Sequence, residues 1–198
     1  MRTPNRYLLL FFFVTVFISL ALGKQVFASE HPKKFTVITT VAPITNMVRN
    51  IGGVYIDVIG VVPDGVDSHT FEPIPSDIKT LQAADLIIAN GLDLELPTLK
   101  LAEKVKKPAT RVVQLGNRTL KEEDWQYDFS FPREHGHPNP HLWLNIQLVM
   151  QYAEIIRDSL SELDPKHQEQ YFLNTETYLA KLTKLDQAIF ACVKTIPE

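Results

Sequence analysis

Two histidines, His69 and His141, each lie in a segment whose residue types suit the capture of a transition metal. His69 follows the turn-forming run Gly65–Ser68, and His141 follows Asn139-Pro140. Pro140 biases Asn139 away from helix, so His141 is expected to project from an extended segment shortly before a helix. A neutral imidazole is the commonest metal ligand among side chains. Taken together, the two contexts predict the beginnings of a transition-metal site, with His69 and His141 as ligands.

Four apolar runs that alternate with helical patterns are the elements that must position these histidines. The runs predict strands at Phe35–Val41, Val54–Val62, Asp85–Ala89 and Arg111–Leu115, separated by helices over Pro43–Arg49, a short stretch capped by Ser76, and Leu94–Val105. This alternation is typical of an α/β fold with a parallel four-stranded sheet and helices on both faces. Ligands of such sheets bind beyond the carboxyl ends of the strands, and His69 lies on the loop that leaves the second strand.

Two longer helices are predicted after the sheet. Apolar residues recur at three- and four-residue steps from Asn145 to Leu163, and Asp164-Pro165 then favours a new helix start. The second pattern comprises Phe172, Thr175, Leu179, Leu182, Leu185, Ile189, Cys192 and Ile196. Its roughly 30 residues would form a rod of about 45 Å, longer than one small sheet needs for cover. We therefore expect an α/β metal-binding lobe over 29–163 and a long linking helix over 164–198. Cys192 is expected to be a small buried hydrophobe of that helix.

The N-terminus has the pattern of a secretory signal peptide. Arg2 and Arg6 precede the apolar run Leu8–Leu22, and Val26-Phe27-Ala28 offers small residues for cleavage. Residues 1–28 are therefore expected to be removed, leaving a protein outside the cytoplasm, in the periplasm or its equivalent. The whole chain has a net charge of −3, and this mildly acidic balance argues against nucleic acid as a partner.

Three ordered segments resemble the metal-binding proteins of zinc and manganese ABC importers. Gly65–Pro73 looks like the first-ligand motif of that family, Asp85–Glu95 like its central strand and turn, and Asn139–Asn145 like its second-ligand motif. The resemblance implies two α/β lobes joined by a long helix, with the metal between the lobes and an ABC membrane permease as partner. It assigns His69 and His141 as ligands from the first lobe and Zn²⁺ or Mn²⁺ as the transported cargo.

The resemblance also sets an expectation for the end of the chain. The family draws a third ligand, histidine or glutamate, from soon after the long helix, and often an acidic fourth. The sequence stops at Glu198, just short of that point, so we expect a truncated gene product that lacks the C-terminal lobe. The membrane is expected to be met only through the signal peptide or the permease.

Other residues and functions receive weaker support. His135 and His137 resemble a shortened form of the family's histidine-rich loop, and a loose metal contact there is a weaker expectation than a solvated loop. The acidic residues Asp64, Asp67 and Glu72 are expected to solvate or cap the loop around His69. The aromatic residues Trp125 and Tyr127, near Phe129 and Phe131, are expected to cover the sheet edge and not to bind a ligand. The main expectation is a binding protein and not an enzyme; a zinc-dependent hydrolase and an adhesin-like surface protein are the alternatives.

Overall fold

A computed structural model describes residues 33–196, so the predicted signal peptide lies outside the described residues. All its helices and strands belong to the unit Lys34–Glu198. The strands are β1 Phe35–Thr39, β2 Ile56–Gly60, β3 Leu86–Ala89 and β4 Arg111–Gln114. The α-helices are α2 Ala42–Gly52, α3 Pro75–Ala83, α4 Leu96–Val105, α5 Leu115–Thr119, α6 Ile146–Leu163 and α7 Gln168–Val193. Short 3₁₀ turns are η1 Gly53–Tyr55, η2 Glu122–Asp124, η3 Arg133–His135, η4 Leu142–Leu144 and η5 Pro165–His167.

The four strands form one parallel sheet in the order β2-β1-β3-β4, which confirms the predicted fold class. Val37 on β1 lies opposite Val58 on β2 and Leu86 on β3, so these three residues are level with one another across the sheet. Because all four strands run the same way, their carboxyl ends meet at one edge of the sheet. The loops after β2 and β3 therefore leave the sheet at the same edge, on either side of β1.

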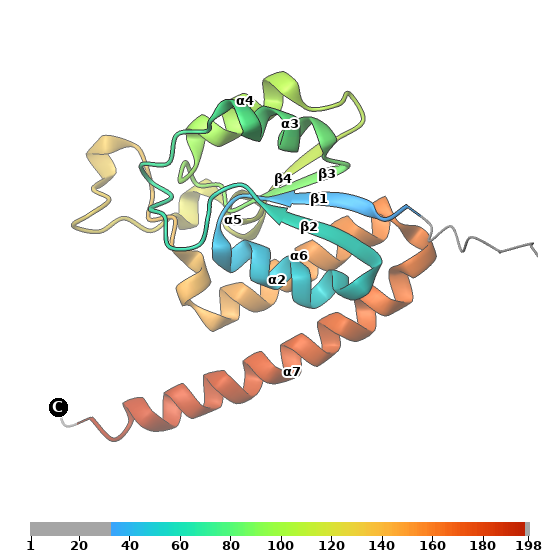
Figure 1. Ribbon diagram of the computed structural model, residues 1–198. Coiled ribbons are helices and arrows are strands. Elements are labelled where there is room, and N and C mark those ends of the chain that lie inside the picture. Colours follow the sequence, from blue (N-terminus) through green and yellow to red (C-terminus); the bar gives the residue numbers. More distant parts are fainter. Residues whose placement is uncertain (1–32, 197–198) are drawn as a thin grey trace, which may run out of the picture. The chain divides into compact units, whose positions relative to one another are not determined.

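Helices cover both faces of the sheet (Figure 1). The side chains of Val37 and Ile88 enter the core shared with α2 and α6. Their neighbours Ile38 and Ile87 enter a second core beneath α3 and α4. Successive strand residues point to opposite faces, so a sheet covered on both sides needs apolar residues throughout. This need explains the unbroken apolar run of β3, whose four residues are all buried.

Several predicted helix and strand boundaries differ from the observed ones, and two of the differences concern the start of α3 and the second strand. Ser76 was predicted to cap α3, but the helix begins at Pro75 and the Asp77 carboxylate accepts a hydrogen bond from the Ile74 backbone N–H at 2.8 Å. The second strand is shorter than predicted, because Val54 and Tyr55 belong to η1. The predicted start of α6 is confirmed: the Asn145 side chain accepts a hydrogen bond from the Gln147 N–H at 2.9 Å.

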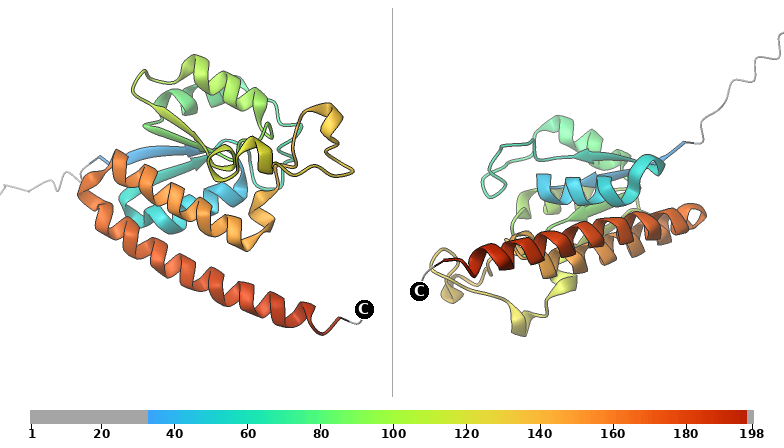
Figure 2. Two further views of the ribbon diagram at one scale, coloured as in Figure 1. Left: turned by 180° about the vertical axis from the view of Figure 1, so that it is seen from behind. Right: turned by 90° about the horizontal axis from the view of Figure 1, so that it is seen from below.

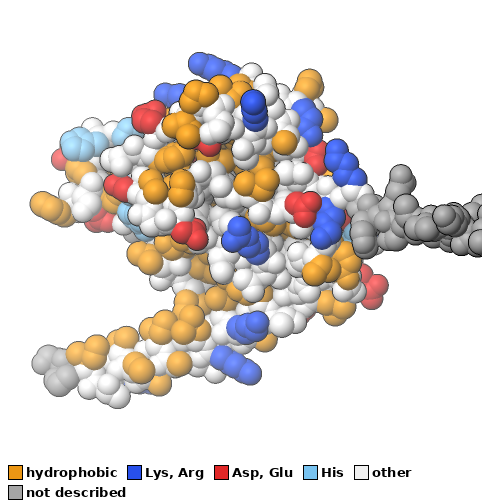
Figure 3. Space-filling model, viewed as in Figure 1, with side chains coloured by type: hydrophobic (Ala, Val, Ile, Leu, Met, Phe, Trp, Pro, Cys, Tyr) orange, Lys and Arg blue, Asp and Glu red, His pale blue; other side chains and the backbone are white. Residues whose placement is uncertain are grey.

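Helix α7 packs against α6 and α2 (Figure 2). Its 26 residues span about 39 Å at 1.5 Å per residue. Tyr171, Thr175 and Leu182 are its buried residues, whereas Phe172, predicted on that face, is half exposed. Beyond Leu182 the apolar side chains are exposed (Figure 3); they are Leu185, Ile189, Phe190, Val193 and Ile196. Cys192 is also exposed, so its predicted burial is wrong. Within residues 33–196 no helix is both long and apolar enough to cross a membrane.

Candidate metal centre

The fold brings His69 and His141 together although they lie 72 residues apart in the sequence. His69 is on the loop between β2 and α3, and His141 immediately precedes η4. Their Nε2 atoms are 3.1 Å apart, and their ring centroids are 5.2 Å apart. The two residues predicted as ligands thus converge on one point at the carboxyl edge of the sheet.

A chain of hydrogen bonds from Asp128 determines which nitrogen of His141 faces His69. The Asp128 carboxylate only accepts, so the amide NH₂ of Asn139 donates to it at 2.6 Å. The Oδ1 atom of Asn139 then faces His141, accepting from its backbone N–H at 2.9 Å and from its Nδ1 at 2.8 Å. Because Oδ1 cannot donate, Nδ1 carries the proton in the neutral imidazole. The Nε2 lone pair is left facing His69, which is the orientation a metal ligand needs.

The surroundings of His141 also favour its neutral form. Burial, followed by the nearby charge of His69, lowers the pKa of His141, and the Asp128 carboxylate opposes this only in part. The Asn139 hydrogen bond is the main cause that lowers the pKa of Asp128, which keeps that carboxylate ionised and accepting. Neutral imidazole is the form that binds metal.

His69 is positioned by its own loop and by an aromatic ring. The Asp67 carboxylate accepts a hydrogen bond from the His69 backbone N–H at 2.9 Å, an Asx turn of the kind predicted for this loop. The ring of Phe131 lies 5.8 Å from that of His69 and 5.4 Å from that of His141. Phe131 therefore packs against both imidazoles, whereas Phe129 is fully exposed.

A buried polar network beneath the site holds the His141 segment to the sheet. Asn90, at the end of β3, donates from its side-chain amide to the backbone carbonyl of Pro140 at 3.0 Å. Its Oδ1 atom accepts from the Tyr152 hydroxyl at 3.2 Å, and its backbone N–H donates to Glu95 at 2.7 Å. Burial raises the pKa of Glu95, although the hydroxyl of Thr40 and backbone N–H groups donate to its carboxylate. The network ties the loop of His141 to two strands and α6.

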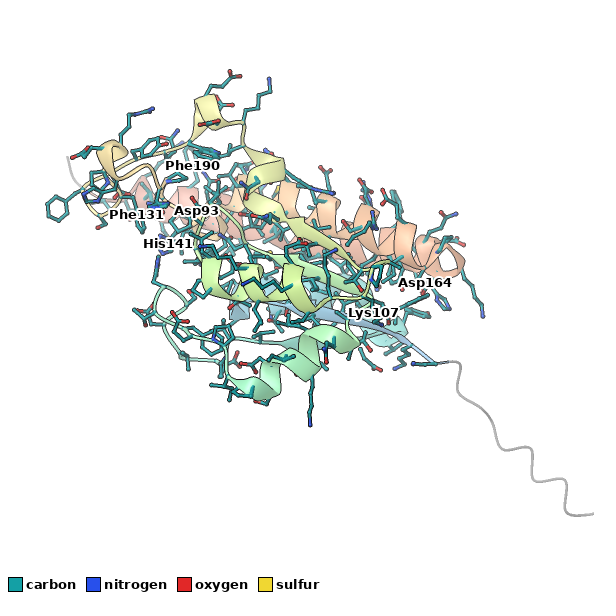
Figure 4. The ribbon with its side chains drawn as sticks, turned by 90° about the horizontal axis from the view of Figure 1, so that it is seen from above. Asp93, Lys107, Phe131, His141, Asp164 and Phe190 are labelled. Atoms are coloured by element: carbon teal, nitrogen blue, oxygen red, sulfur yellow. The ribbon has the colours of Figure 1, made fainter. Side chains whose placement is uncertain are left out.

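His135 and His137 lie near the pair but do not join it. The Nδ1 atom of His137 is 2.9 Å from the Asp93 carboxylate. His137 and Asp93 line a cavity that also adjoins His69. Figure 4 shows Asp93, Phe131 and His141 gathered at one end of the molecule, with Asp164 and Lys107 at the other. Within residues 33–196 no three or more His, Cys, Asp or Glu side chains are grouped so that they could hold a metal ion.

The separation of the two imidazoles suits a shared ion. Two nitrogens 3.1 Å apart, each at the usual Zn–N distance of about 2.0–2.1 Å, subtend an angle of roughly 100° at the ion. That angle lies close to the tetrahedral value. The two imidazoles would supply two of the four ligands that zinc normally takes, so the remaining ligands must come from elsewhere.

Sequence reasoning found the two histidines but missed the residues that orient them. Asn139 and Phe131 lie on a long irregular segment where no periodic pattern indicates their contacts. Asn90 was interpreted as part of an Asn-Gly turn. The sequence feature that could have identified Asn90 is its position at the carboxyl end of a fully buried strand. A polar side chain there has to find buried hydrogen-bond partners.

Comparison with known proteins identifies the family of the chain. Residues 37–198 match the family model described as zinc-uptake complex component A, periplasmic. The manganese ABC transporter substrate-binding lipoprotein PsaA of Streptococcus anginosus is 34% identical, over 100% of this chain and 63% of its own length. The iron-binding protein YfeA of Yersinia pestis is 34% identical, over 85% of this chain and 52% of its own.

Solved structures resemble the fold as well. The periplasmic zinc-binding protein TroA of Treponema pallidum superimposes with a TM-score of 0.75 at 26% identity, over 83% of this chain and 57% of that protein. The Mn-bound periplasmic metal-binding protein of Candidatus Liberibacter asiaticus gives a TM-score of 0.66 at 30% identity, over 75% and 53%. The chain thus spans little more than half the length of the proteins it matches. Because the family model covers most of the chain, the chain belongs to the family of periplasmic component A proteins of zinc-uptake complexes.

Proposed function

We propose that this chain captures a divalent transition metal, Zn²⁺ or Mn²⁺, as the solute-binding component of an ABC importer. His69 and His141 are its first two ligands, and the chain acts outside the cytoplasm and delivers its cargo to a membrane permease. The single observation that carries the proposal is the 3.1 Å approach of the two Nε2 atoms. Two relatives are named as a manganese transporter's substrate-binding protein and an iron-binding protein, which supports a metal as cargo.

The arrangement favours binding over catalysis. A catalytic zinc site commonly has three protein ligands and an activated water, whereas two imidazoles converge here. The Asp67 carboxylate accepts a backbone hydrogen bond from His69, so its present contact is structural. The relatives described above are named as binding proteins, which supports a receptor and disfavours the zinc hydrolase. We therefore propose that the chain is not an enzyme.

The same proposal assigns a role to each part of the chain. Residues 29–163 would form the metal-binding lobe, and residues 164–198 the helix that links it to further structure. Apolar side chains of α7 beyond Leu182 are exposed, as expected of a surface that another part of the receptor covers.

Titration of the purified chain with Zn²⁺ and Mn²⁺ tests the proposal. We expect one metal per chain, with binding weakened at least tenfold in His69→Ala and in His141→Ala. The matched control is His167→Ala, because His167 lies just before α7, far from the site. Its Nδ1 atom is hydrogen-bonded to the Asp164 carboxylate. Equal metal binding by the chain and by the double variant His69→Ala/His141→Ala would refute the site.

A further inference from the structure

Helices α3 and α4 and the two residues after α4 carry a lysine-rich outer surface, here called the basic face. Its lysines are Lys79, Lys100, Lys104, Lys106 and Lys107. The same segments contain only two carboxylates, Asp77 and Glu103. The two helices pack side by side, and lysine and arginine side chains gather over them at the top of the molecule in Figure 3. Positive charge is therefore concentrated on this side of the sheet.

The carboxylates in and beside the basic face already have partners. The Asp77 carboxylate accepts a backbone hydrogen bond at the start of α3. Glu103 pairs with Lys106 at 3.7 Å, and Asp85 pairs with Lys107 at 2.7 Å. The exposed lysines of the basic face that form no ion pair with any residue of 33–196 are Lys79, Lys100 and Lys104. Three positive charges of this face are thus left uncompensated by the fold.

The spacing of two of these lysines works against the helix that carries them. Lys100 and Lys104 lie four residues apart on α4, and like charges at this spacing destabilise a helix. Lys104 lies in the last turn, where the helix dipole favours a cation, but Lys100 lies in the middle of α4 and gains little from it. A charge that opposes its own helix and has no partner in the fold suits a partner outside the fold.

Other surfaces of the molecule lack this excess of positive charge. Helix α7 contains more carboxylates than lysines, and residues 61–74 contain three carboxylates but no lysine or arginine. Helix α7 also lies across the sheet from α3 and α4 (Figure 1). Structure that continues from α7 therefore attaches on the side away from the basic face.

The basic face extends to the amino edge of the sheet. The Asp85 carboxylate accepts a hydrogen bond from the Thr36 N–H at 2.9 Å and pairs with Lys107. Lys107 therefore lies beside the start of β1, which follows the exposed Lys33 and Lys34. In Figure 4 this lysine is at the end of the molecule opposite the two imidazoles. A partner that covers the basic face leaves the metal-binding edge accessible.

We propose that the basic face binds the anionic lipid headgroups of the membrane that holds the permease. A lysine beside an anionic membrane strengthens binding roughly fivefold. No large apolar side chain of α3 or α4 is exposed, so the face lacks the apolar anchors typical of a protein partner. The contact is electrostatic and reversible. The inference rests on the proposed function, which brings the chain to a membrane, and adds a lipid contact to those expected through the permease and the signal peptide.

Sedimentation of the exported and purified chain with lipid vesicles tests the inference. The vesicles contain phosphatidylcholine alone, or phosphatidylcholine with about 30% of the anionic lipid phosphatidylglycerol. We expect at least tenfold tighter binding to the anionic vesicles. Raising NaCl from about 0.05 M to about 0.5 M shortens the Debye length from about 14 Å to about 4 Å and should remove this preference.

A single neutral substitution separates lipid binding from folding. Lys100→Gln removes one uncompensated charge and should weaken binding to anionic vesicles about fivefold. The same change relieves the repulsion between Lys100 and Lys104, so stability in urea should be unchanged or greater. Weaker vesicle binding by a protein of undiminished stability supports a direct lipid contact. Unchanged vesicle binding would mean that Lys100 does not touch the membrane.

A pair of charge reversals tests whether this face is responsible. Lys79→Glu/Lys100→Glu should weaken binding to anionic vesicles at least tenfold. The matched control is Lys181→Glu/Lys184→Glu, which changes the net charge equally at exposed positions of α7. Because α7 lies across the sheet, beyond a Debye length from a membrane at the basic face, the control should bind as wild type does.

The outcomes separate the lipid contact from metal capture. Equal binding to neutral and anionic vesicles refutes the lipid contact. Equal losses in the two charge-reversed proteins mean that net charge decides, and the basic face is then wrongly assigned. Titration of the same proteins with Zn²⁺ is independent of the vesicles. Normal Zn²⁺ binding without a vesicle preference leaves metal capture standing, whereas a vesicle preference without Zn²⁺ binding refutes metal capture and leaves the lipid contact.

Discussion

The side-chain amide of Asn90 donates a hydrogen bond to the backbone carbonyl of Pro140 at 3.0 Å, which joins the end of β3 to the residue before His141. Asn90 is fully buried, and the Tyr152 hydroxyl donates to its other amide atom. His141, which we propose as a metal ligand, thus takes its position from a buried strand. The geometry of the proposed site therefore depends on contacts in the core.

Replacing Asn90 by leucine tests that dependence. The substitution keeps the volume but leaves the buried Tyr152 hydroxyl without its acceptor, which costs about 1–3 kcal/mol. The Pro140 carbonyl loses the Asn90 hydrogen bond, worth about 0.5–1.5 kcal/mol, but keeps the one from the Leu142 N–H. We expect the free energy of unfolding in urea to fall by about 2–4 kcal/mol, and Zn²⁺ affinity to fall in the fraction that stays folded. Asn50→Ala, at an exposed position of α2 whose amide bonds only Asn46, should change stability by less than about 0.5 kcal/mol.

Asn139→Ala should weaken metal binding with little effect on the fold. The variant removes the amide that orients His141 and links it to Asp128. Loss of such an orienting partner typically lowers metal affinity by about 10–100-fold. Calorimetric titration with Zn²⁺ measures the effect, with Gln126→Ala as control, because that exposed side chain bonds only the Asp124 carbonyl. Unchanged affinity would mean that packing against Phe131 and Trp143 suffices to orient the ring.

The sequence predicted the parts of this molecule that depend on local periodicity. The strand Leu86–Ala89 follows from an apolar run and the start of α6 near Asn145 follows from helical periodicity, and both lie where they were expected. The two histidines were found because turn residues and parallel topology place a loop at a known edge. Contacts such as Asn90 to Pro140 could not be found, since they join segments 50 residues apart through the folding of an irregular segment. The contacts of Phe131 with the two imidazoles were missed for the same reason.

The buried carboxylate of Glu95 should give the fold a defined dependence on pH. Burial raises its pKa above the usual value of 4.5, so the folded state holds the proton more tightly than the unfolded state. Stability from this group is fully present below about pH 4.5 and is lost as the pH rises through the folded pKa. We therefore expect the unfolding free energy of wild type relative to Glu95→Gln to decrease as the pH is raised from about 4.5.

Urea unfolding of both proteins across that range measures the difference, and the histidines cancel because both proteins contain them. A difference that instead grows with pH would mean that the hydrogen bonds from Thr40, Asn90 and Gly91 outweigh burial and lower the pKa of the carboxyl group.

Two leucines three residues apart on α7 should respond very differently to the same substitution. Leu182 is 8% exposed and packs into the core with α2 and α6, whereas Leu185 is 50% exposed. Leu182→Ala leaves a cavity and should lower the free energy of unfolding by about 2–3 kcal/mol. Leu185→Ala removes a half-exposed side chain and should change it by less than about 1 kcal/mol. Urea unfolding of the purified chain compares the two at several protein concentrations. An equal loss at Leu185, growing with protein concentration, would show that a second copy covers this part of α7 in solution, because only an intermolecular contact makes stability depend on concentration.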